Sequence, residues 1–191
     1  MPETRKSRRE QIRGFADKSF ADHQLTKVSD GTIPQMFRCG KPGTGMYSFT
    51  VTFIPGNVIV TGDLSGLILC CYDKDSLSWL MKAHNDLDYM LGKAENKERE
   101  FVEYEAEQCV QEWIKEGYLT EEKAAEIRDY KHQDDALDPG VNWLRACCDA
   151  DIDDPPHCDD WSSQMLWQAY ALQKFVELYD AMQVVVPENA A

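Results

Sequence analysis

The sequence predicts an α+β fold, in which a four-stranded antiparallel meander is followed by a packed set of helices. Segments rich in β-branched and aromatic residues fill residues 35–72, and short turn sequences separate them. After residue 75 the spacing of the apolar residues changes from every second residue to the spacing of a helix. Strands that precede the helices, without alternating with them, are typical of the α+β class.

The predicted meander has four strand-like segments within residues 35–72. Phe49, Val51 and Phe53 alternate with threonines, which predicts a strand with one buried and one solvent-facing side. The segments read QMFRC, MYSFTVTFI, NVIVTG and GLILCCY, and the turns between them read GKPGTG, PGN and DLSG. Turns this short join neighbouring antiparallel strands. Ahead of the meander, residues 1–30 are expected to form a basic N-terminal arm or helix.

The helices are expected to complete a single α+β domain, residues 31–191, whose acidic helical part spans residues 75–182. The clearest amphipathic helix is predicted over residues 95–117, where Gly117 ends the apolar pattern. Thr120 has the residue type and position of a cap for the following helix.

Composition and charge narrow the class of protein. The hydrophobic fraction of 43% is sufficient for a core, and the sequence contains no apolar run of the roughly 20 residues that a membrane span needs. Seven cysteines, an odd number, without an export signal predict a reducing compartment. Residues 84–160 contain twenty-three acidic and eight basic residues, a formal charge of −15 within a chain of −14. Such a field repels nucleic acid and attracts basic protein surfaces.

The segment DADIDDPPHCDD, residues 149–160, invites a metal-binding interpretation. Asp149, Asp151, Asp153 and Asp160 fall on ligand positions of a calcium-loop pattern, but Asp154 stands where the pattern needs glycine. A zinc site would use the candidates Cys147, Cys148, His157 and Cys158. These form two adjacent pairs, whose side chains diverge, whereas zinc sites usually space their ligands. No metal and no other cofactor is therefore predicted.

On composition alone, charge that only confers solubility is favoured over its alternative, an acidic contact surface for a partner. Carboxylates three or four residues apart on a helix lie about 5–6 Å apart, and phosphates on a DNA strand advance about 3.4 Å each. The predicted partner-binding residues are Asp149, Asp151, Asp153, Asp154, Asp159, Asp160, Glu100, Glu103 and Glu107, with the other glutamates of residues 95–126 flanking them. Direct binding of nucleic acid is not expected, and the residues that could contact phosphate if it occurred are Arg5, Lys6, Arg8, Arg9 and Arg13.

The β-segment and the residues after it resemble a family of small accessory proteins of tailed bacteriophages. The matching elements are Phe37-Arg38-Cys39, Pro42-Gly43-Thr44, Tyr47 with Phe49, Pro55-Gly56, Gly62-Asp63, residues 75–80 and DYMLGKA at 88–94. The resemblance covers about a third of the chain and implies no enzymatic activity.

What the resemblance implies is a phage-encoded protein that acts in the host bacterial cytoplasm. Together with the acidity, it predicts an inhibitor of a host nucleic-acid-handling or defence complex, of the anti-CRISPR type, that occupies a basic surface. No catalytic residue is predicted, and a binding protein is favoured over an enzyme. The alternatives left open are a metal-dependent enzyme, a nucleotide or other small-molecule binder, and a minor virion assembly protein.

Overall fold

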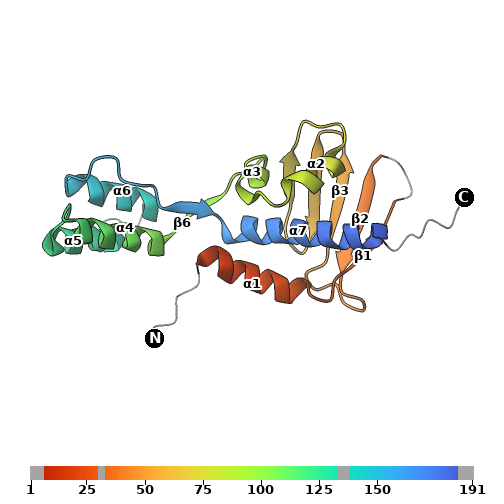
Figure 1. Ribbon diagram of the computed structural model, residues 1–191, viewed down its shortest axis with the longest axis horizontal. Coiled ribbons are helices and arrows are strands. Elements are labelled where there is room, and N and C mark those ends of the chain that lie inside the picture. The colour runs from red at the N-terminus through yellow and green to blue at the C-terminus, as the bar shows by residue number, and fades with distance from the viewer. Residues whose placement is uncertain (1–6, 30–32, 133–137, 185–191) are drawn as a thin grey trace, which may run out of the picture. The chain divides into compact units, whose positions relative to one another are not determined.

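The computed structural model describes residues 7–29, 33–132 and 138–184, and within these ranges the fold is α+β (Figure 1). The described residues form a five-stranded antiparallel sheet and seven α-helices. The chain divides into two compact units. We call residues 1–98 with 161–191 the sheet unit, and residues 99–160 the helical unit.

The sheet is a meander, as predicted, because every strand pairs antiparallel with its neighbour in sequence. The strands are β1 (Gln24–Lys27), β2 (Gln35–Gly40), β3 (Phe49–Ile54), β4 (Asn57–Gly62) and β5 (Leu67–Cys70). The predicted count of four is one too few, because β1 lies within the segment expected to be an arm. Its sequence QLTK has one apolar residue, Leu25, and its other residues are exposed, so no alternating pattern marks it. Pairing with β2 makes it a strand.

One face of the sheet is buried under the long helix α7 (Ser163–Val184). The ring of Phe175 lies 5.6 Å from that of Phe37 and 5.4 Å from that of Phe53, centroid to centroid. Helix α1 (Arg8–Phe20) runs beside α7 (Figure 1), and Phe20 stacks on Trp167 at 5.9 Å. The helical segment of the predicted arm is therefore part of the core of the sheet unit. The short helices α2 (Ser76–Ala83) and α3 (Leu87–Leu91) complete the unit.

The helical unit is built around Trp143, which is 1% exposed. Its elements are β6 (Arg99–Phe101), α4 (Glu103–Glu116), α5 (Glu121–Arg128), the 3₁₀ turn η1 (Asp129–His132), α6 (Pro139–Asp149) and β7 (Asp159–Trp161), whose last residue falls in the sheet unit. Helix α4 begins later than predicted, because β6 pairs with β7 and the Val102 amide donates to the Cys158 carbonyl at 2.7 Å. Gly117 ends α4 with φ of 80°, and Thr120 caps α5 through the Lys123 amide, as predicted.

Compact units defined by contacts are not the same as units that fold independently. The predicted boundary between an arm, residues 1–30, and one domain, residues 31–191, therefore stays a prediction. None of the helices in the described ranges combines the length and apolar character that crossing a bilayer requires.

Candidate functional site

The net negative charge of the protein comes almost entirely from the helical unit. Residues 99–160 contain nineteen acidic and six basic residues, a formal charge of −13. The sheet unit contains fifteen acidic and fourteen basic residues, a formal charge of −1. The net electrostatic field that would attract a basic partner therefore originates mainly in the helical unit. This makes the helical unit the candidate interaction site.

The acidic loop, residues 149–154, starts at the last residue of α6. Asp149, Asp153 and Asp154 are exposed, and none of their carboxylates forms a hydrogen bond or ion pair with another described residue. Asp151 is also exposed and accepts a hydrogen bond from the Lys123 ammonium at 3.2 Å. Because the Asp151 side chain is 89% exposed, this pair is screened by water and leaves the carboxylate accessible.

Two of the six predicted contact aspartates are engaged within the fold. Asp160 is 5% exposed, so its carboxylate is buried in β7. Asp159 is half-buried and forms an ion pair with Arg99 of β6 at 2.8 Å. Asp159 and Asp160 were predicted as contact residues because they lie near the acidic loop in sequence. In the structure they belong to β7, which pairs with β6, and their role is structural. The accessible part of the predicted cluster is the acidic loop.

Of the predicted glutamates, Glu100 lies in β6, and Glu103 and Glu107 lie in α4. Glu100 and Glu103 are exposed. Glu107 is half-buried and accepts two hydrogen bonds from Arg128, at 2.8 Å to Nη2 and 3.1 Å to Nε. This hydrogen bonding raises the pKa of Arg128 further above its ordinary value. Glu107 therefore ties α4 to α5, and its charge is largely compensated.

Three of the glutamates that were predicted to flank the first contacts form a column along α4. Glu105, Glu112 and Glu116 are exposed and share one helix face, at intervals of seven and four residues. At 1.5 Å per residue their spacing along the axis is about 10 Å and 6 Å. Three and two phosphate steps on a DNA strand span about 10 Å and 7 Å. A different face carries the buried Ala106 and Val110, so the apolar stripe could have located this column from sequence.

The four zinc candidates do not converge. Cys147 and Cys158 are buried, while Cys148 and His157 are exposed. Among the described residues, no three His, Cys, Asp or Glu side chains are grouped so that they could hold a metal ion. The Cys158 thiol instead faces the thiol of Cys109 at 3.9 Å. Burial raises the pKa values of Cys147 and Cys158 to about 12, so both remain protonated thiols at neutral pH.

The predicted phosphate-contacting arginines that the structure describes are used within the sheet unit, while Arg5 and Lys6 lie outside the described residues. Arg8 donates to the Trp161 carbonyl at 2.7 Å and to the Ser163 hydroxyl at 2.9 Å. Arg9 makes a bidentate pair with Asp88 at 2.9 and 3.1 Å. Arg13 lies over the Tyr170 ring at 5.6 Å. These contacts anchor α1 and occupy the guanidinium groups.

Comparison of the chain with protein-family models, with curated proteins and with solved structures finds no match. The interpretation of the helical unit therefore depends on its own charge, exposure and geometry.

Proposed function

We propose that this protein is an acidic binding protein that occupies a basic surface on a nucleic-acid-handling or defence complex through its helical unit. The observation that carries the proposal is the concentration of charge: residues 99–160 hold −13 of the net −14. The exposed acidic loop and the glutamate column of α4 would be the first contacts. A partner evolved to hold a phosphate backbone presents the complementary charge.

The proposed mechanism is competition with DNA or RNA for one groove. Fixed carboxylates on helices replace phosphates, and no bond is made or broken. The phage-like β-segment supports an anti-defence role of the anti-CRISPR type, acting in the bacterial cytoplasm. Asp159, Asp160 and Glu107 would contribute to the geometry of the unit, because their carboxylates are buried or paired.

Neutralisation of the acidic loop tests the proposal. Asp151 and Asp154 adopt φ of 63° and 50°, a backbone region that asparagine tolerates well, so Asn is the substitution of choice. The test variant replaces Asp149, Asp151, Asp153 and Asp154 by Asn. A smaller variant, Asp153→Asn with Asp154→Asn, has a matched control in Asp63→Asn with Asp180→Asn. All four of these carboxylates are exposed and without a partner among the described residues, and both doubles change the charge equally.

The tagged protein is incubated with bacterial lysates that contain defence complexes, and bound material is eluted with rising salt. We expect one stoichiometric nucleic-acid-binding complex that leaves as salt rises, and whose binding to its own nucleic acid is inhibited by the protein. The loop variants should lose this inhibition and the control double should keep it. Inhibition that is unchanged by the fourfold variant, or by salt, would overturn the proposal.

A further inference from the structure

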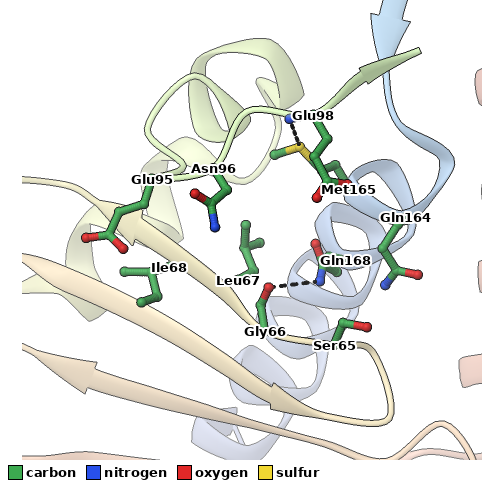
Figure 2. A pocket seen from close by; sticks show the side chains of 10 residues that line it. All are labelled: Ser65, Gly66, Leu67, Ile68, Glu95, Asn96, Glu98, Gln164, Met165 and Gln168. Carbon is green, nitrogen blue, oxygen red and sulfur yellow. Dashed lines mark hydrogen bonds between the residues drawn. The ribbon is translucent and has the colours of Figure 1, made fainter.

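A pocket of about 340 Å³ opens in the sheet unit, at the edge of the sheet formed by β5. Its apolar floor is formed by Leu67 and Met165, which are 5% and 3% exposed. The residues that line it are Ser65, Gly66, Leu67, Ile68, Glu95, Asn96, Glu98, Gln164, Met165 and Gln168 (Figure 2). A volume of this size accommodates an extended side chain or a small metabolite.

Hydrogen bonds hold the side-chain amide of Gln168 in one orientation, in which its oxygen has no donor among the described residues. The side chain is 2% exposed, and its Nε2 donates to the Leu64 carbonyl at 2.7 Å and towards the Gly66 carbonyl at 3.5 Å. Because a backbone carbonyl can only accept, the NH₂ group of Gln168 must face Leu64 and Gly66, and its oxygen Oε1 faces away from them. Figure 2 shows it turned from Gly66 to the side on which Glu98 lies. This oxygen accepts no hydrogen bond from any described residue.

The carboxylate of Glu98 is positioned at the same pocket by its backbone. Its amide donates to the sulfur of Met165 at 3.1 Å (Figure 2). Its carbonyl accepts from the Ser162 amide at 2.9 Å. One carboxylate oxygen also accepts a long hydrogen bond, 3.4 Å, from the Ser162 hydroxyl. Glu95 also lines the pocket, but its carboxylate points away from Gln168 (Figure 2) and lies 3.9 Å from the Cys70 sulfur, while its amide donates to the Ile68 carbonyl of β5 at 3.0 Å. None of the described residues that line the pocket carries a positive charge.

We propose that this pocket binds a guanidinium group. The oxygen of the Gln168 amide and the carboxylate of Glu98 offer acceptors without a compensating cation in the pocket lining, which favours a positively charged donor. The apolar floor suits the methylene stem of an arginine-like chain, whereas a bare metal ion would leave most of the volume unfilled. Guanidinium also offers five N–H donors in a plane and is more weakly hydrated than an ammonium group. The proposal is independent of the function proposed for the helical unit.

Guanidinium can come from a free small molecule or from an arginine side chain of a polypeptide. The probes are therefore N-acetyl-arginine amide and the pentapeptide Gly-Gly-Arg-Gly-Gly, each with its citrulline counterpart, which has nearly the same shape but no charge. Dissociation constants are measured by NMR titration of the full chain, following the amides of Gly66 and Ile68. Citrulline probes should bind at least about tenfold more weakly, because charge-assisted hydrogen bonds are the stronger ones.

Glu98→Lys should weaken the binding of the arginine probes by at least about tenfold, because the new ammonium group would repel them. The Glu98 side chain is exposed, so the fold should accommodate the substitution. Asp180→Asn, an exposed carboxylate of α7 away from the pocket lining, is the control and should change nothing. A pentapeptide that binds more tightly than the capped amino acid identifies a polypeptide source, and equal affinities identify a small guanidino compound. Equal binding of arginine and citrulline probes, or of wild type and Glu98→Lys, overturns the proposal.

Discussion

The indole rings of Trp113 and Trp143 stack with their centroids 6.0 Å apart and their planes 7° apart. Trp143 is also packed edge-to-face on Tyr130, at 5.8 Å, and its Nε1 donates to the Pro156 carbonyl at 2.8 Å. One side chain thus joins α4, α6 and η1 to the segment after the acidic loop. The helical unit has few other large buried groups to hold together a charge of −13.

Trp143→Phe should therefore destabilise the helical unit selectively. The change removes the hydrogen bond to Pro156 and part of the stacked surface, which together cost about 2–3 kcal/mol. Hydrogen exchange followed by mass spectrometry should show faster exchange across α4 and α6, while exchange across α7 keeps its wild-type rate. Equal acceleration in α7 would show that the two units unfold as one.

Removal of the Glu107 carboxylate should destabilise the protein less than Trp143→Phe does. Both partners of the Arg128–Glu107 pair are more than a third exposed, so water screens the interaction. We expect Glu107→Gln to lower the free energy of unfolding by about 0.5–1 kcal/mol in urea titrations. Glu112→Gln, on the exposed column of α4, is the control and should lower it by less. A larger loss in the control would mean that the pair contributes nothing.

The sheet was largely predictable from sequence, because alternation in β3 follows directly from burial of one face: Phe49, Val51 and Phe53 are buried and the threonines between them are not. The edge strand β1 was not predictable in this way, because hydrogen bonds to β2, not side-chain burial, make it a strand. For the site, composition located the acidic segment. Only tertiary structure separates the exposed Asp153 from the buried Asp160, since β7 pairs with a strand nearly sixty residues earlier.

The buried thiols should make the protein less stable in alkali. Burial raises the pKa values of Cys39, Cys147 and Cys158 to about 12, from an ordinary value near 9. Between these two values the unfolded chain loses thiol protons that the folded chain keeps, so stability falls as pH rises. Urea midpoints should be level up to about pH 8.5 and decline from about pH 9 upwards. Cys39→Ala should show a shallower decline, and an unchanged slope would contradict the assignment for Cys39.

Two glycines should respond oppositely to alanine. Gly62 has φ of 118°, and a Cβ there would lie 2.6 Å from the Ser48 carbonyl oxygen, so Gly62→Ala should destabilise the sheet unit by at least about 2 kcal/mol. Gly14 lies inside α1, where an added Cβ would meet no side chain within 4 Å, so Gly14→Ala should stabilise by about 0.5–1 kcal/mol. Thermal unfolding of both variants checks the pair, and a stabilising Gly62→Ala would contradict the β3–β4 geometry.

The crowded charge of the helical unit should have a measurable cost in stability. Nineteen acidic against six basic residues repel one another within residues 99–160, whereas the sheet unit is nearly neutral. Raising sodium chloride from about 0.02 to 0.5 M shortens the Debye length from roughly 20 Å to 4 Å. Hydrogen exchange should then slow across α4, α5 and α6 and change little across β2 to β4. Asp153→Asn with Asp154→Asn should reproduce part of this effect at low salt, by a few tenths of a kcal/mol, because two unpaired charges are removed. If the double variant exchanged faster than wild type, the acidic loop would be stabilising the fold, and its charges would need no partner to explain them.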